Sequence, residues 1–205
     1  LPSYAGLLMQ KEVETLSELL EKDGKPMTLI VGGAKIDTKI GLISNFVNKA
    51  DYFLVGGGLA NTFLAAQGLD VGKSLYEPEK IGVAEKTMKL VGNSSETFVL
   101  PTDVIVAEEI SDDAKTDEIS ANTVHGEMKI LDIGTHTAEK FAEIIARSKI
   151  VVWNGPVGLF EKKPFSKGTF AIAKALKEAK NVQTILGGGD TIDAINHFGF
   201  KESDF

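Results

Sequence analysis

The sequence predicts an α/β fold, a Rossmann-like three-layer α/β/α sandwich with a mainly parallel central sheet. Short apolar segments rich in β-branched residues alternate along the chain with segments of helical periodicity, and this alternation is typical of βαβ units. The short segments are apolar on both faces, as strands of a parallel sheet covered by helices on each side must be. Four of them end directly in glycine-rich turns, which follow the strands in folds of this class.

Periodic apolar residues indicate the helices. The first helix is expected over residues 7–20, where apolar residues recur at helical spacing before Asp23 and Gly24. Three later helices are indicated by Ile36, Ile40, Ile43 and Phe46 or Val47, by Phe141, Ile144 and Ile145, and by Ile172, Ala175 and Leu176.

Between these helices lie the expected strands. The acidic, turn-rich stretch 108–127 is the least regular, and we interpret it as a surface excursion of the same domain. No internal repeat or linker divides the chain, so residues 1–205 are expected to form a single domain. The expected strands are Met27–Val31, Tyr52–Val55, 97–100 with 104–106, 128–131, 149–153 and 182–186.

Composition excludes several classes of function. The chain has 205 residues, 43% of them hydrophobic, and a net charge of −7, which argues against binding to nucleic acid or to an anionic membrane. Without cysteine there are no disulfides or thiolate metal sites, and a reducing cytoplasm is permitted. No apolar run approaches the roughly 18–20 residues that cross a bilayer. We therefore expect a cytoplasmic monomer. The chain begins with Leu1 and ends at residues 200–205 without a helix cap, which suggests a piece of a longer protein.

Glycine-rich turns at the ends of the strands indicate a ligand site. They are Gly32-Gly33, Gly56-Gly57-Gly58, the segment 154–158, and Gly187-Gly188-Gly189. The carboxyl edge of an open α/β sheet is where ligands bind, because the following helices point their free N–H groups into one crevice there. Glycine lets a phosphate or a flat base approach the backbone. The alternative interpretation is that these glycines only form tight turns. The presence of four such turns on one edge argues against it.

Two familiar nucleotide motifs do not fit these turns. The segments beginning at Gly56 and Gly187 resemble the dinucleotide fingerprint, but Asn61 and Ile192 stand where its third glycine should be. The segment 68–74 resembles a P-loop, yet it has three residues between its glycines instead of four and follows no strand. A nucleotide would therefore be bound in neither of these modes.

Charged residues follow two of the turns. Lys35 and Lys39 come after Gly33, on what we expect to be the first turns of a helix, where cations oppose the helix dipole and an anion should compensate them. The alternative is a solvated lysine face. Asp190 follows Gly189 and is expected either to cap the next helix or to hold Mg²⁺ beside a phosphate. No Gly-x-Ser-x-Gly motif supplies a hydrolase nucleophile.

Several segments in succession resemble the signatures of phosphoglycerate kinases. The resemblance runs from about Gly6 to the end of the chain, and the segments at 153–161 and 187–191 are highly specific. The matching segments are 32–40 (GGAKIDTKI), 56–60 (GGGLA), 101–104 (PTDV), 131–134 (LDIG), 153–161 (WNGPVGLFE) and 187–191 (GGGDT).

The resemblance implies a role for each of these positions. The family moves a phosphoryl group between 1,3-bisphosphoglycerate and ADP, and this chain resembles its C-terminal, nucleotide-binding half. By similarity, the adenine would lie against Gly33, Gly57, Gly58, Leu75, Leu131, Pro156 and Leu159, with Asn154 at the nucleotide and Glu161 on the ribose. Lys39 and Thr191 would contact phosphates of ADP or ATP, Lys35 the transferring phosphoryl group, and Asp190 the Mg²⁺ ion, and the Gly187-Gly188-Gly189 turn would also bind the nucleotide.

The sequence also departs from the family pattern. The N-terminal half that binds 3-phosphoglycerate or 1,3-bisphosphoglycerate is absent, with its transition-state arginine, as are a later Ser-Thr-Gly-Gly-Gly turn and the C-terminal tail. Thr135 follows Gly134 where the family usually has proline. We expect nucleotide binding with negligible turnover. Two alternatives stay open: a Rossmann-like dehydrogenase fragment, and a non-catalytic module with purely architectural glycines.

Overall fold

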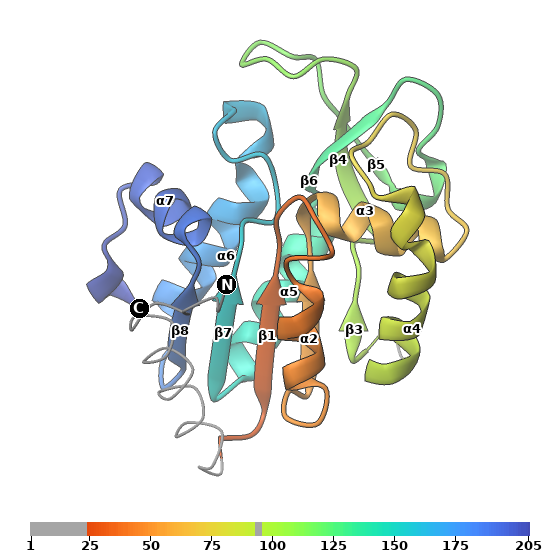
Figure 1. The fold of residues 1–205 in the computed structure, drawn as a ribbon. Coiled ribbons are helices and arrows are strands. Elements are labelled where there is room, and N and C mark those ends of the chain that lie inside the picture. Colours follow the sequence, from red (N-terminus) through yellow and green to blue (C-terminus); the bar gives the residue numbers. More distant parts are fainter. Residues whose placement is uncertain (1–23, 93–95) are drawn as a thin grey trace, which may run out of the picture.

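Five parallel strands form the central sheet of the computed structural model, which describes residues 24–92 and 96–205 (Figure 1). The expected helix at 7–20 lies outside the described residues. The strand order β3-β2-β1-β7-β8 places the first two expected strands side by side with the last two. These strands are β1 (Met27–Val31), β2 (Tyr52–Val55), β3 (Phe98–Val99), β7 (Ile150–Asn154) and β8 (Gln183–Gly187).

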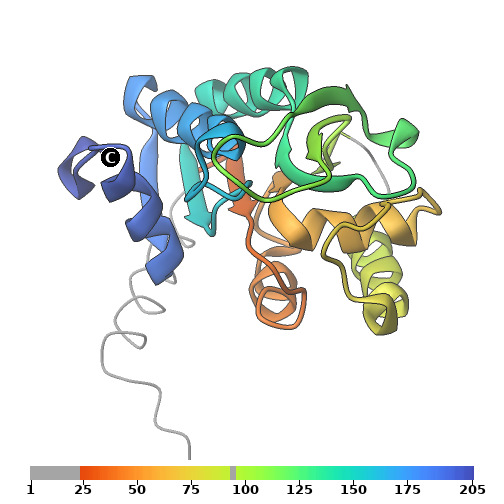
Figure 2. The ribbon, with the colours of Figure 1, turned by 90° about the horizontal axis from the view of Figure 1, so that it is seen from above.

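The register of the sheet brings the carboxyl ends of four strands to one level. Val31 of β1 pairs with Val55 of β2 on one side and with Asn154 of β7 on the other, and Asn154 pairs in turn with Gly187 of β8. Each of these strands ends at or next to this row of partners. The four glycine-rich turns therefore start side by side along one edge, as the sequence predicted, and Figure 2 looks onto this edge from above.

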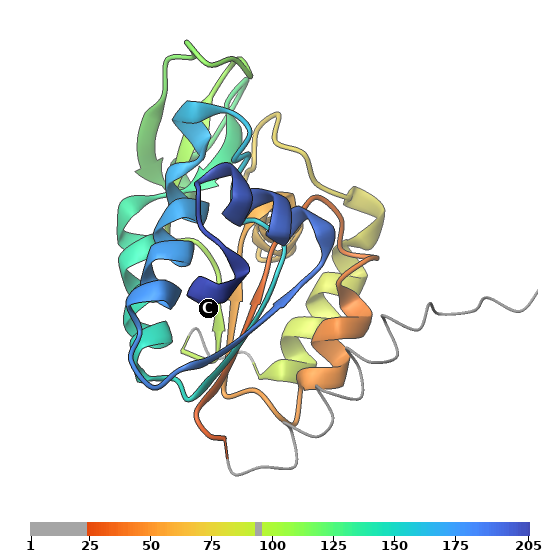
Figure 3. The same ribbon diagram turned by 90° about the vertical axis from the view of Figure 1, so that its left-hand side faces the viewer.

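Helices cover both faces of the sheet, which confirms the three-layer architecture (Figure 3). Successive residues of β1 point to opposite faces: Leu29 packs with the helices of one layer, and Ile30 packs with those of the other. The first layer consists of α2 (Ile40–Phe46), α3 (Gly57–Ala66) and α4 (Ile81–Val91), and the second of α5 (Thr135–Arg147), α6 (Lys167–Glu178) and α7 (Gly189–His197). The short 3-10 helices are η1 (Pro78–Lys80), η2 (Ala121–Thr123), η3 (Lys163–Phe165) and η4 (Glu202–Asp204).

A second, antiparallel sheet was not predicted. The segments expected as parallel strands at 104–106 and 128–131 form β4 (Asp103–Ala107) and β6 (Lys129–Ile133), which pair with each other antiparallel. The expected surface excursion contains β5 (Asp117–Ser120), which pairs with β4 as the third strand. Apolar content marked β4 and β6 as strands, but it carries no information on the direction of pairing. The side chains of β5 are mostly exposed, so this strand has no apolar pattern at all.

Within the described ranges, no helix combines the length and the apolar character needed to cross a membrane.

Candidate functional site

Backbone hydrogen bonds join three of the glycine-rich turns. The amide of Gly33 donates to the carbonyl of Pro156 at 2.9 Å, and that of Gly57 donates to the carbonyl of Val157 at 2.9 Å. A Cβ atom at Gly57 would lie 2.8 Å from the carbonyl oxygen of Gly33, and the φ of Gly57 is +66°. These glycines therefore allow the turns to pack closely together, as the alternative interpretation held. The packed turns also line a cavity.

Thr191 attaches the fourth turn to the turn that follows β7. Its hydroxyl accepts from the amide of Gly155 at 2.7 Å and donates to the carbonyl of Gly187 at 2.7 Å. Thr191 is fully buried. The resemblance implied that Thr191 contacts a phosphate; in this structure its hydroxyl group makes these two hydrogen bonds to the backbone. Thr191 holds the turn in place.

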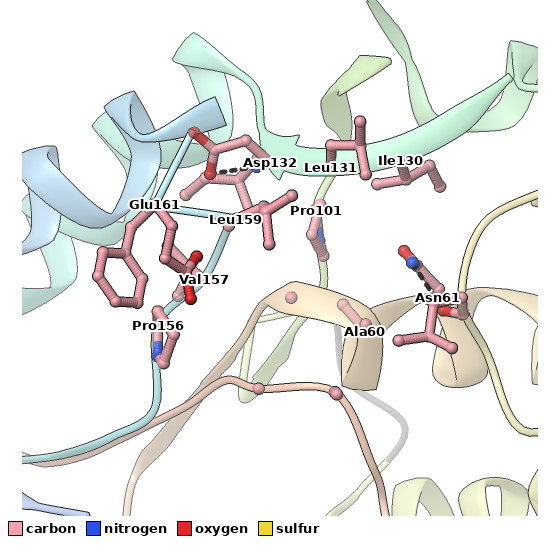
Figure 4. Close-up of a pocket in the computed structure, with 18 of the residues that line it drawn as sticks. Ala60, Asn61, Pro101, Ile130, Leu131, Asp132, Pro156, Val157, Leu159 and Glu161 are labelled. Atoms are coloured by element: carbon pink, nitrogen blue, oxygen red, sulfur yellow. Dashed lines mark hydrogen bonds between the residues drawn. The ribbon is translucent and has the colours of Figure 1, made fainter. Parts of the chain in front are cut away.

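A cavity of about 300 Å³ lies at this edge, between α3 and β6. In Figure 4, Ala60 and Asn61 of α3 form one wall, and Ile130 and Leu131 of β6 lie opposite. Its size is at the lower end of the range for small-molecule sites. The lining includes nine residues predicted from the sequence: Gly33, Gly57, Gly58, Leu75, Leu131, Pro156, Leu159, Glu161 and Asp190.

Sequence reasoning missed other lining residues. Ile110 is 52% exposed, so it presents an apolar side chain to solvent beside the cavity, as the predicted Leu75 does. Asn61 and Asp132 are polar and almost fully buried there. Most of the missed residues lie in the segments that resemble family signatures, but no role was assigned to them, and the second sheet that brings several of them to the cavity was not predicted. The missed residues are Ala34, Ala60, Asn61, Pro101, Ile110, Ile130, Asp132, Ile133, Val157, Gly158 and Phe160.

Lys39 and Asn154 meet beside the cavity. The ammonium group of Lys39 donates a hydrogen bond to Oδ1 of Asn154, and its Cε lies 3.5 Å from the position of a Cβ at Gly33. Partial burial lowers the pKa of Lys39, and the negative charge of Asp190 opposes this effect. Lys39 is thus close enough to Asp190, which lines the cavity, for their opposite charges to interact.

The predicted helix position of the two lysines is wrong. Helix α2 begins at Ile40, and Lys39 precedes it as the N-cap residue. Lys35 lies in the preceding loop and is exposed. The amide of Ile40 donates to the carbonyl of Ile36 at 2.8 Å, so a turn closes over the same spacing that suggested a longer helix. Lys35 therefore does not oppose a helix dipole, and Lys39 is positioned by its contact with Asn154.

Asp190 lies in the first turn of α7 and is exposed at the cavity. Gly188 is the N-cap residue, so Asp190 does not cap this helix through its side chain, which was one of its two expected roles. The described part of the chain has no cluster of three or more acidic or histidine side chains that could hold a metal. A cation at Asp190 would therefore need further oxygen ligands from a phosphate and from water, which is how Mg²⁺ is usually held.

Asp132 is a buried carboxyl group behind the apolar wall. It accepts hydrogen bonds from the amides of Gly168 at 2.8 Å and Ile133 at 2.9 Å. Burial raises its pKa to about 8, because desolvation outweighs these hydrogen bonds and the positive charge of Lys167. Next to it, the amide of Leu159 donates to the carbonyl of Leu131 at 2.8 Å, which joins the two leucines of the wall.

Comparison with known proteins gives consistent matches. The model of the family described as phosphoglycerate kinase matches residues 1–205. A solved structure of phosphoglycerate kinase from Coxiella burnetii is 42% identical, with a TM-score of 0.88, over 94% of this chain and 50% of that one. A structure of phosphoglycerate kinase from Pyrococcus horikoshii OT3 is 30% identical, with a TM-score of 0.77, over 96% of this chain and 50% of that one. The chain spans about half the length of these structures.

Proposed function

Because the chain belongs to the phosphoglycerate kinase family, we propose that it is the nucleotide-binding domain of such a kinase and that it binds Mg-ADP or Mg-ATP in the cavity at the carboxyl edge of its sheet. The observation that carries this proposal is the nearness of Lys39 to Asp190, whose opposite charges interact beside a cavity with a mainly apolar lining. An apolar slot with charged groups beside it matches a flat base that is joined to a polyphosphate.

The adenine ring would lie in the slot. Leu131 and Leu159, joined through their backbones, form an apolar wall, and Leu75 is available at the opposite side next to Gly58. Gly57 and Gly58 have no side chains, so a planar ring can approach the start of α3 closely. Glu161 is exposed at the cavity and is a suitable acceptor for the ribose hydroxyl groups.

The phosphates would lie toward the turn before α7. Gly187, Gly188 and Gly189 precede or begin this helix, whose N-terminal amides attract anions. Lys39, held by Asn154, supplies a positive charge. Asp190 would hold Mg²⁺ together with phosphate oxygens, and the ion would neutralise charge that develops during transfer.

The reaction of the whole protein would be reversible phosphoryl transfer between 1,3-bisphosphoglycerate and ADP, the glycolytic reaction of a cytoplasmic enzyme. Lys35 is exposed in the loop after β1 and is the candidate for contact with the transferring phosphoryl group. Such transfers depend on positioning and on electrostatic stabilisation, so they need no covalent protein intermediate. The acid substrate would be bound by residues outside these 205. Alone, this chain should bind nucleotide with negligible turnover.

Calorimetric titration of the 205-residue chain tests the proposal. Mg-ADP should bind with measurable heat, and NADH should not, because a dehydrogenase fragment would prefer the dinucleotide. No heat with Mg-ADP would instead favour a module whose glycines are only architectural. A coupled kinase assay should detect no turnover by the chain alone, and activity should appear when a separately produced N-terminal half of the kinase is added.

A further inference from the structure

Asn61 carries a buried oxygen atom that has no hydrogen-bond partner. The residue lies on α3, lines the cavity, and is 1% exposed. Its Nδ2 atom donates to the backbone carbonyl of Leu75 at 3.0 Å. Its Oδ1 atom is the only buried side-chain nitrogen or oxygen without a partner in the described part of the chain. Such atoms are rare in folded proteins, because an unpaired buried acceptor loses its hydrogen bonds to water and gains none in return.

The orientation of the Asn61 amide is fixed by Leu75. A backbone carbonyl only accepts hydrogen bonds, so the NH₂ group must face Leu75 and the oxygen must face the other way. Figure 4 shows the Asn61 oxygen pointing toward the strand that carries Ile130 and Leu131, on the opposite wall. The side chains of these two residues are apolar and have no donor to offer. The partner of this oxygen should therefore come from a ligand.

The position of Asn61 indicates which part of the nucleotide would reach it. In Figure 4, Glu161 and Asn61 lie at opposite ends of the cavity, with Leu159 and Pro101 between them. If the ribose contacts Glu161, the base extends toward Asn61. The edge of adenine that lies far from the ribose carries the exocyclic 6-amino group, which is a hydrogen-bond donor.

We propose that Oδ1 of Asn61 accepts a hydrogen bond from the 6-amino group of adenine and thereby selects adenine over 6-oxopurine nucleotides. The inference rests on the proposed nucleotide-binding function. A 6-oxo group, as in inosine diphosphate, would place a second acceptor against the Asn61 oxygen, and neither atom could donate. A purine without any 6-substituent would leave that oxygen unpaired, as it is in the present structure.

Base analogues test the proposal on the unmodified chain. Calorimetry with the Mg²⁺ complexes of ADP, inosine diphosphate and purine riboside diphosphate should show ADP binding about five- to tenfold more tightly than either analogue, the value of one such hydrogen bond. Equal affinities for ADP and the two analogues would overturn the inference and leave the proposed function standing. No binding of any of the three nucleotides would overturn both.

Two variants isolate the amide oxygen. Asn61→Leu should bring the ratio of ADP to inosine diphosphate affinity close to one. Asn61→Leu also loses the hydrogen bond to Leu75, but this loss alters the slot for both nucleotides alike. The ratio of the two affinities therefore reports on the Oδ1 atom. Thr62→Val is the matched control, since Thr62 accepts from the amide of Glu77 at 3.1 Å and also links α3 to the segment after Leu75. It should keep the wild-type ratio. Retention of the full preference by Asn61→Leu would refute the assignment, and if this variant does not fold, the three-nucleotide comparison decides alone.

Discussion

The side chain of Lys39 reaches from the loop after β1 to the last residue of β7, where its ammonium group donates a hydrogen bond to Oδ1 of Asn154. The contact fixes a positive charge beside the cavity before any ligand arrives. Lys39 is partly buried, so its ammonium group loses some of its hydration. This desolvation lowers the pKa of Lys39, and the negative charge of Asp190 opposes the shift. The negative charge of a bound phosphate group would further offset this loss of hydration.

Lys39→Ala should therefore weaken the binding of Mg-ADP. A hydrogen bond to a charged group contributes about 1.5–3 kcal/mol, which corresponds to a loss of roughly ten- to a hundredfold in affinity. Calorimetric titration measures the dissociation constant directly. Lys89→Ala is the control, because Lys89 is exposed in the last turn of α4 and should leave the affinity unchanged. Equal affinities of Lys39→Ala and wild type would remove Lys39 from the site.

Asp190→Ala should affect the binding of ADP only when Mg²⁺ is present. The carboxylate contributes through the cation, so in a chelator the variant and the wild type should bind ADP with similar affinity. Asp193→Ala offers a matched control, because Asp193 is exposed on the same helix. A defect of the same size with and without Mg²⁺ would show that Asp190 acts on the nucleotide or on the turn rather than through the metal.

Gly57→Ala should destabilise the chain, whereas Gly189→Ala should not. Gly57 has a φ of +66°, and a Cβ there would come within 3 Å of both the nitrogen and the oxygen of Gly33, so the two loops must separate. We expect a loss of about 1–3 kcal/mol in the free energy of unfolding. At Gly189 a Cβ meets no atom within 4 Å, and alanine favours the helix. Denaturant titrations compare the two; equal stabilities would mean that the packing of the loops does not depend on Gly57.

Features encoded in short stretches of sequence could be predicted. The apolar segments at Met27–Val31 and Tyr52–Val55 have the bounds of β1 and β2, because burial on both faces leaves a continuous apolar run. The shared edge of the four glycine-rich turns followed from parallel pairing. Ile36 misled the prediction of α2, because its spacing from Ile40 is the same in an isolated turn and in a helix.

Features that depend on distant pairing could not be predicted. β5 is mostly exposed and pairs antiparallel with β4, so neither its pattern nor its direction was visible. That sheet brings β6, and with it Asp132, to the cavity. Asn61 appeared in the sequence only as a residue that breaks the dinucleotide fingerprint. Its unpaired oxygen depends on where the carbonyl of Leu75 lies, which is a tertiary relationship.

The buried carboxyl group of Asp132 should make stability depend on pH. Its folded-state pKa of about 8 lies above the ordinary value of 3.8, so the folded chain binds this proton more tightly than the unfolded chain does. The resulting stabilisation is complete below about pH 4 and is lost as the pH rises to about 8. Between pH 5 and 7 the free energy of unfolding should fall by up to about 1.4 kcal/mol per pH unit from this group.

Asp132→Asn removes the titrating group and keeps its shape and one acceptor oxygen for the amide of Gly168. Denaturant titrations from pH 5 to pH 9 should therefore give a smaller pH dependence for this variant than for the wild type. The difference between the two should level off above about pH 8, where the wild-type carboxyl group is ionised in both states. Asp113→Asn, a change at an exposed position, should retain the wild-type slope. Parallel curves for wild type and Asp132→Asn would mean that the hydrogen bonds from Gly168 and Ile133 outweigh desolvation and keep Asp132 ionised in the folded chain.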